Sequence, residues 1–212
     1  MMASPGASSS SSSAPPLGGL VMAGGYSRRM GRDKAGLVYH GQPQWEWTRD
    51  RLREVVDRVW ISCREEQELG APAERIPDPV PGQGPIGGFL AAHAAVPGQA
   101  WLAVACDLPR LDGAGLRTLV AARAPHLLAT VYASAEGLPE PLCAIYEPTV
   151  FPVLREALAA GTACPRRVLR ELGDRVRLVP LPRPDLLDNA NTPEEAAALG
   201  APGALGGGEE RG

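Results

Sequence analysis

Short apolar runs alternate with helix-like segments through the middle of the chain, and this alternation restricts the fold more than any other feature. The expected strands cover 17–23, 58–63, 101–106, 127–134, 141–147 and 175–181. The expected helices cover 45–56, 85–96, 115–124, 148–161 and 192–200. Because strands joined through helices form crossover units, this order predicts an α/β fold with a mainly parallel, doubly wound sheet. Ligands bind such sheets beyond the carboxyl ends of the strands.

The two ends of the chain lie outside this pattern and set the expected domain boundaries. Residues 1–16 form a Ser/Ala/Pro tract and residues 201–212 form a Gly-rich tail. Neither carries enough apolar side chains to offset the entropy of ordering the chain, so we expect two disordered tails. The segment 17–200 is then a single domain, long enough to bury one core without disulfides or a structural metal.

Composition excludes several classes of function. The net charge of −3 disfavours a basic surface that would bind nucleic acid. The four cysteines are far apart and form no CxxC pair, so a zinc site is not expected. The chain has no secretory signal and no apolar run of about 18 residues, which predicts a cytoplasmic protein with reduced thiols and no membrane association.

A Gly-rich loop, AGGYSRRMGRDK at 23–34, directly follows the first expected strand. Its two adjacent glycines let the backbone approach a ligand closely, and successive N–H groups can face an anion. Three arginines and one lysine follow, which suits a triphosphate. The loop matches neither the Walker A nor the GxGxxG pattern. From these residues alone, the alternative is a solvated turn.

Acidic residues follow two other apolar segments. Asp107 ends the expected strand 101–106, where a carboxylate beside a triphosphate is a natural Mg²⁺ ligand. The alternative for Asp107 is a helix N-cap or a surface turn. Asp78 precedes a proline, which by itself favours an Asx-Pro turn. The glycines of GQGPIGG at 82–88 fit either close approach to a base or sugar, or tight packing of a helix on the sheet.

The histidines do not suggest a nucleophilic catalytic site. His40, His93 and His126 lie on unrelated segments, and the chain offers no Ser/His/Asp arrangement. His93 shares a face of the expected helix with Ile86 and Phe89, so a packed histidine is the favoured interpretation.

Five segments together resemble one family, the molybdenum cofactor guanylyltransferases. The resemblance is carried, in the family's order, by MAGGYSRRMGRDKAGL at 22–37, SCREEQ at 62–67, PD at 77–78 with GQGPIGG at 82–88, ACDLP at 105–109 and NANTPEE at 189–195. It implies a single Rossmann-like domain with a mixed sheet, of the nucleotide-diphospho-sugar transferase type. It also implies Mg²⁺-dependent transfer of GMP from GTP to the phosphate of molybdenum-molybdopterin, giving the guanine dinucleotide cofactor and pyrophosphate.

The same resemblance implies site residues and partners. The expected catalytic residues are Lys34, Arg29 and Asp107, with Asp107 as the metal ligand. The expected nucleotide-binding residues are Met22, Ala23, Gly24, Gly25, Lys34, Arg64, Asp78 and Asp107. The expected pterin-side residues are Asn189, Asn191 and Glu140. The implied partners are GTP, the molybdopterin cofactor and molybdoenzyme maturation proteins.

Three alternatives remain open from the sequence. A related cytidylyltransferase acts on the same cofactor, but that group tends to carry Ala-Ala-Gly where this chain has Ala23, Gly24 and Gly25. Sugar-phosphate nucleotidyltransferases typically carry a Gly-Thr-Arg element that this loop lacks. The third alternative is a non-catalytic nucleotide-binding module in molybdoenzyme maturation, against which the presence of both Lys34 and Asp107 argues.

Overall fold

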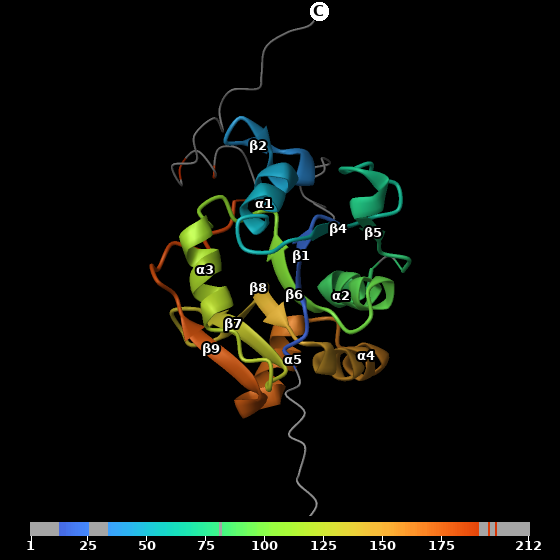
Figure 1. Cartoon of the computed structure of the whole chain (residues 1–212), viewed down its shortest axis with the longest axis vertical. Helices are drawn as coiled ribbons and strands as arrows, with labels where there is room; N and C mark the ends of the chain where they lie inside the picture. Colours follow the sequence, from blue (N-terminus) through green and yellow to red (C-terminus); the bar gives the residue numbers. More distant parts are fainter. Residues whose placement is uncertain (1–12, 26–33, 81, 191–194, 196–197, 199–212) are drawn as a thin grey trace, which may run out of the picture.

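A seven-stranded mixed sheet forms the centre of the part of the chain that the structure describes (Figure 1). The structure is a computed structural model and describes residues 13–25, 34–80, 82–190, 195 and 198. The sheet has the order β5-β4-β1-β6-β8-β7-β9. Its strands are β1 (Leu17–Met22), β4 (Val59–Cys63), β5 (Arg75–Pro77), β6 (Ala100–Ala105), β7 (Ala129–Ala133), β8 (Pro139–Tyr146) and β9 (Val176–Pro180). β8 is antiparallel to both of its neighbours, and every other pair in this sheet is parallel.

Helices cover both faces of the sheet (Figure 1). They are α1 (Gln44–Leu52), α2 (Gly84–Ala95), α3 (Gly113–Ala121), α4 (Phe151–Ala159) and α5 (Pro165–Leu172). α1 and α3 pack into one apolar cluster, and α2, α4 and α5 pack into a second cluster on the opposite face. Neighbouring residues of one strand therefore enter different clusters, as Leu20 and Val21 do. This arrangement is the doubly wound architecture that the alternating pattern predicts.

Shorter elements connect the layers. β2 (Val38–Tyr39) and β3 (Gln42–Pro43) form a small hairpin before α1. The 3₁₀ turns are η1 (Lys34–Gly36), η2 (Pro72–Glu74), η3 (Pro148–Val150) and η4 (Gly173–Arg175). Among the described residues, no helix is long and apolar enough to cross a membrane.

All six expected strands are present, and so are the first four expected helices, with ends shifted by a few residues. β6 shows why these predictions hold, because its six residues are all buried and helices cover both of its faces. The strand β5, the helix α5 and the short hairpin of β2 and β3 were missed. β5 has only three residues, and the eight-residue α5 buries only Pro165, Val168, Leu169 and Leu172. The expected helix 192–200 lies largely outside the described residues.

The N-terminal boundary of the folded part lies earlier than expected. The carbonyl of Pro16 accepts a hydrogen bond from the Ala100 N–H at 2.9 Å. The carbonyl of Pro15 accepts one from Nη2 of Arg123 at 2.8 Å. Residues 13–16, which we assigned to a disordered tail, therefore include direct contacts to the domain. Residues 1–12 lie outside the described part of the chain.

His93 is a packed residue, as its helical position predicts. Its ring stacks on that of Phe151 in α4, with ring centroids 4.2 Å apart and planes 3° apart. Burial lowers the pKa of His93, and the charge of Arg155 lowers it further. The side chain is therefore neutral at pH 7 and holds α2 against α4.

A buried ion pair between Arg123 and Glu147 gives a test of the fold. Nε and Nη2 of Arg123 donate to the two carboxylate oxygens at 2.7 and 2.9 Å, and Glu147 is 1% exposed. Arg123→Ala leaves that carboxylate buried without its partner, so we expect the free energy of unfolding to fall by about 3 kcal/mol. Urea denaturation measures it.

The matched control is Arg167→Ala, which removes an exposed ion pair with Glu171 on α5. Such a pair contributes about 0.5 kcal/mol or less. Equal losses in the two variants would contradict the assigned role of the buried pair.

Candidate active site

A cavity of about 420 Å³ opens at the carboxyl ends of β1, β4 and β6. These three strands are parallel, and the register aligns Met22 with both Ser62 and Ala105, so their ends lie level. The N-terminus of α2 closes one side through Gly84, Pro85 and Gly88. The lining residues are Met22, Ala23, Gly24, Gly25, Ser62, Arg64, Glu65, Glu66, Asp78, Pro79, Gly82, Gly84, Pro85, Gly88, Ala105, Cys106, Asp107 and Leu142.

The structure brings most of the expected nucleotide residues to this one cavity. Met22, Ala23, Gly24, Gly25, Arg64, Asp78 and Asp107 all line it. The backbone of Lys34 begins η1, but its side chain lies outside the described part of the structure, as does the whole of Arg29. Asn191 also lies outside the described residues.

Two pairs of adjacent glycines, Gly24 with Gly25 and Gly87 with Gly88, lie at or next to the cavity and have different surroundings. A Cβ on Gly24 would lie no closer than 3.6 Å to its surroundings, and one on Gly25 would meet no described atom within 4 Å. Neither position has a positive φ, so among the described residues the fold itself does not require glycine there. Both positions leave space against the backbone at the cavity.

The sequence left two interpretations of the glycines in GQGPIGG, namely close approach of a ligand or tight packing of a helix, and the structure distinguishes them at Gly87 and Gly88. A Cβ on Gly87 would lie 2.8 Å from Oδ2 of Asp78, and one on Gly88 would lie 2.5 Å from Oγ of Ser62. These two positions therefore serve tight packing of α2 against β4 and the loop that follows β5. Gly82 and Gly84 have positive φ and line the cavity.

Arg64 and Gln67 hold the Gly-rich loop against the exit of β4. Nη1 of Arg64 donates to the Gly24 carbonyl at 3.3 Å, and Nε2 of Gln67 donates to the Ala23 carbonyl at 3.3 Å. Oε1 of Gln67 accepts from the Arg64 N–H at 2.7 Å, so this buried amide is bonded on both sides. Sequence reasoning missed Gln67 as a site residue, because a glutamine within a short loop carries no pattern.

Asp78 forms the Asx turn that its sequence predicts and also faces the cavity. Its Oδ1 accepts from the Val80 N–H at 3.1 Å, and its own N–H donates to the Cys63 carbonyl at 2.8 Å. The second hydrogen bond ties the loop after β5 to the end of β4. The turn and the position at the cavity are therefore compatible.

Asp107 lies in a turn directly after β6, and the helix-cap alternative is wrong. The N-cap of α3 is Asp112, whose Oδ1 accepts from the Gly115 N–H at 2.8 Å. The carbonyl of Asp107 accepts from the Ala190 N–H at 2.9 Å. This contact brings the exposed Asn189 beside the segment that carries Asp107.

Glu140, a residue expected on the pterin side, pairs with an arginine of α5. Its Oε2 accepts from Nη2 of Arg166 on α5 at 2.8 Å, and it is not among the residues that line the cavity. Leu142, two residues further along β8, does line it. The wall that β8 contributes is thus apolar at the cavity surface.

The described lining is acidic. It contains Arg64 as a cation, but Glu65, Glu66, Asp78 and Asp107 as carboxylates. An anionic ligand next to these carboxylates requires added positive charge, from the basic loop 26–33, from Lys34 or from a metal ion. The described residues contain no cluster of three or more metal-binding side chains. Asp107 at a strand end fits an ion that takes one or two protein carboxylates and completes its shell with phosphates and water, as Mg²⁺ does.

Comparison with known proteins identifies the family. Residues 19–176 match the model of the MobA-like NTP transferase domain. The chain is 38% identical to a molybdenum cofactor biosynthesis bifunctional protein of Synechocystis sp. (strain ATCC 27184 / PCC 6803 / Kazusa), with 85% of this chain and 52% of that protein covered. It is 33% identical to a molybdenum cofactor guanylyltransferase of Pseudomonas fluorescens (strain Pf0-1), with 85% and 92% covered.

A solved structure supports the fold. Molybdopterin-guanine dinucleotide biosynthesis protein A of Archaeoglobus fulgidus superposes with a TM-score of 0.68 at 24% identity, covering 86% of this chain and 96% of that one. The expected single domain with a Rossmann-like mixed sheet is therefore confirmed, and its fold is that of the Archaeoglobus protein. From the match of its domain and the identity of its relatives, the chain belongs to the family of MobA-like NTP transferase domains.

Proposed function

We propose that this protein is a molybdenum cofactor guanylyltransferase, which transfers GMP from GTP to the phosphate of molybdenum-molybdopterin and releases pyrophosphate. The observation that carries the proposal is the convergence of Gly24, Arg64 and Asp107 on one cavity at the ends of parallel strands. A cavity of about 420 Å³ is in the size range of small-molecule sites. The name of the Pseudomonas relative supports guanine as the base and the molybdenum cofactor as the acceptor.

The residues of the chain act by binding, orienting and stabilising charge. The acceptor phosphate attacks the α-phosphorus, so no protein nucleophile is needed. Gly24 and Gly25 leave space for the triphosphate to approach the backbone. Negative charge grows on the bridging oxygen and the leaving pyrophosphate, and we assign Lys34 and Arg29 to neutralise it. Cations held there stabilise the transition state more than the ground state.

We assign the metal to Asp107 and its identity to Mg²⁺. The acidic lining and the lack of a self-sufficient metal cluster among the described residues support an ion that is shared between protein and phosphates. When bound, the ion supplies positive charge to the phosphates. The carboxylate of Asp107 would hold that ion, and Asp78 contributes a second acidic group to the cavity lining.

We assign the binding of the acceptor, molybdenum-molybdopterin, to the segment that carries Asn189 and Asn191, and call this part of the site the acceptor side. The hydrogen bond from Ala190 to Asp107 supports this placement, because it brings Asn189 next to the proposed metal ligand. Glu140 stays a weaker pterin candidate, since its carboxylate is paired with Arg166. Molybdoenzyme maturation proteins as partners and the cytoplasm as location complete the proposal, and the four free thiols suit a reducing compartment.

The experiment that tests this function compares nucleotides. The full chain is incubated with Mg²⁺, molybdenum-loaded molybdopterin and each of GTP, CTP, ATP and UTP, and the dinucleotide is identified by mass spectrometry. We expect the guanine dinucleotide and stoichiometric pyrophosphate from GTP alone. A cytosine product would instead assign the cytidylyltransferase activity, and GTP binding without pyrophosphate release would assign a non-catalytic module.

Asp107→Ala tests the metal ligand. We expect kcat to fall on the order of 10²-fold or more, because a preorganised charge contact at the phosphates is lost. The control is Asp57→Ala, which removes an exposed carboxylate from the loop at the opposite end of β4. Pyrophosphate release and circular dichroism are measured for both. Near-normal turnover in Asp107→Ala would exclude this residue as the essential ligand.

Gly25→Ala tests whether the open space at the Gly-rich loop holds the nucleotide. The added methyl group meets no described protein atom, so we expect an unchanged Tm but a KM for GTP raised on the order of tenfold. Gly36→Ala is the matched control, because that glycine also has open surroundings and lies outside the cavity lining. An equal KM in the two variants would argue against contact between the nucleotide and Gly25.

A further inference from the structure

The chain returns from the far end of the sheet to Asp107 through residues 181–190, here named the return segment. β7 and β8 separate β9 from β6, so the segment crosses three strand spacings, roughly 14 Å, along the carboxyl edge. It contains no helix or strand and runs beside α3 (Figure 1). Its last residue, Ala190, donates its N–H to the Asp107 carbonyl at 2.9 Å. The position of Asn189 therefore depends on what holds this segment.

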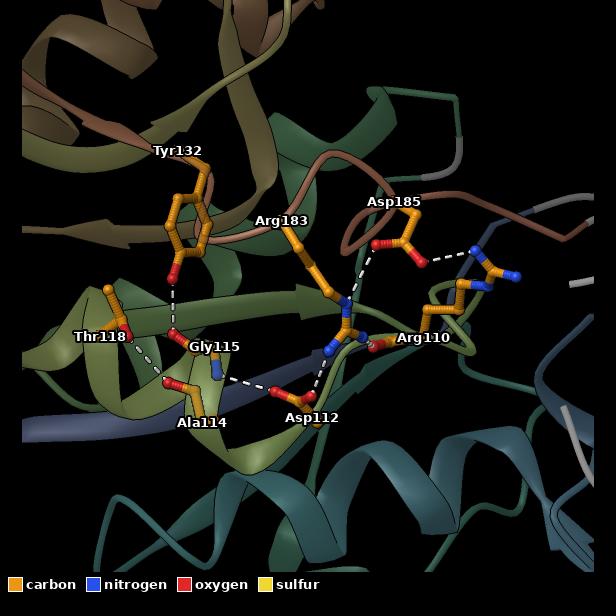
Figure 2. Close-up of polar contacts among 8 residues, drawn as sticks. All are labelled: Arg110, Asp112, Ala114, Gly115, Thr118, Tyr132, Arg183 and Asp185. Carbon is orange, nitrogen blue, oxygen red and sulfur yellow. Dashed lines mark hydrogen bonds and ion pairs between the residues drawn. The ribbon is translucent and has the colours of Figure 1, made fainter. Parts of the chain in front are cut away.

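Arg183 holds the return segment through a clamp formed with Arg110, Asp112 and Asp185 (Figure 2). Nη1 of Arg183 donates to Oδ2 of Asp112 at 2.6 Å, and Nε donates to Oδ1 of Asp185 at 3.1 Å. Nη2 donates to the carbonyl of Arg110. Nη1 of Arg110 in turn donates to Oδ2 of Asp185 at 2.5 Å. Three nitrogens of one planar guanidinium reach three acceptors, which a lysine ammonium cannot reproduce.

The clamp is fastened to a rigid part of the core. Asp112 uses Oδ1 to cap α3 through the Gly115 N–H, which leaves Oδ2 for Arg183. The hydroxyl of the fully buried Tyr132 donates to the Gly115 carbonyl at 2.6 Å (Figure 2). Leu186 of the return segment is also fully buried, and a Cβ on Gly115 would lie 2.8 Å from its Cδ2.

The charges of the clamp are maintained at neutral pH. Burial alone raises the pKa of Asp112, but the hydrogen bonds from Gly115 and Arg183 and the charge of Arg183 outweigh it, so the pKa of this carboxyl lies below its usual value. Asp112 therefore stays ionised opposite Arg183.

We infer that Arg183 is a positioning residue for the transfer reaction: through the clamp it fixes Asn189 beside Asp107, on the acceptor side of the cavity. The inference rests on the proposed function. The clamp joins the segment of Asp107 to the return segment. Arg110 follows Asp107 by three residues, and Asn189 directly precedes Ala190, which contacts Asp107.

A purely stabilising role does not account for the clamp. The side chains of Arg183 and Asp112 are 40% and 43% exposed, and ion pairs this exposed add little to stability. A displacement of about 1 Å of an orienting group, by contrast, can cost on the order of 10²-fold in rate. The nucleotide side of the cavity, at Gly24, Arg64 and Asp78, makes no contact with the clamp in the interactions described above. Loss of Arg183 should therefore affect kcat and leave the binding of GTP unchanged.

The test uses Arg183→Ala and Arg183→Lys in the full chain, with GTP, Mg²⁺ and the molybdenum-loaded pterin. We expect kcat to fall on the order of tenfold to 10²-fold in both variants, with the KM for GTP within about twofold of the original. Arg183→Lys keeps the positive charge but loses the planar guanidinium that reaches three acceptors at once, so it should not restore the rate. Asp112→Asn keeps the helix cap and loses the charge, and should give a smaller loss of kcat.

The matched control is Arg117→Ala. Arg117 lies on α3, the helix that Asp112 caps, and forms an exposed ion pair with Glu54 at 3.5 Å. It touches neither the return segment nor the cavity lining in the described contacts. We expect its kcat to equal that of the unaltered protein.

A second measurement separates this inference from the proposed function. Hydrogen exchange at the Ala190 amide should be faster in Arg183→Ala than in the original, whether or not the protein turns over GTP. If the original protein makes no product, the proposed function fails and the exchange experiment still tests the clamp. With an active original, a kcat within twofold in Arg183→Ala would overturn the inference. So would unchanged exchange at Ala190, or a loss of kcat matched by a higher KM for GTP and a lower Tm.

Discussion

The parallel pairing of β1 with both of its neighbours is the constraint on which the candidate site depends. Met22 pairs with Ser62 on one side and with Ala105 on the other, so three strands end at one level. Gly24, Arg64 and Asp107 each lie two residues beyond that level and meet around one cavity. A slip of one residue in either pairing would turn the side chains of that strand to the opposite face and separate these groups.

The sequence predicts those parts of the fold and site that depend on local pattern. The apolar run that ends in Asp107 identifies β6, and the adjacent glycines mark the loop after β1. Gln67 and Arg183 could not be found in this way, because each acts on a segment far away along the chain. Gln67 bonds to a carbonyl 44 residues earlier, and Arg183 bonds to a carboxylate 71 residues earlier.

The glycines of the site show the same limit of prediction from local sequence pattern. The sequence places Gly24 and Gly88 in similar Gly-rich segments, but their surroundings differ. A side chain at Gly88 would strike Ser62, whereas one at Gly24 would make only ordinary contacts. The packing therefore requires glycine at position 88 and does not require it at position 24. Only the positions of neighbouring strands and helices distinguish these two needs.

The contact between Ala190 and Asp107 also determines when the site is completed. The strands β1, β4 and β6 all lie within the first half of the chain, and their pairing can form while synthesis continues. The hydrogen bond that joins Ala190 to Asp107 spans more than eighty residues, and such distant pairing is slow to form. A nascent chain that has reached β9 thus contains the strands that bound the cavity, but not yet Asn189 and Ala190. The residues that carry the proposed acceptor side are consequently the last part of the site to be synthesised.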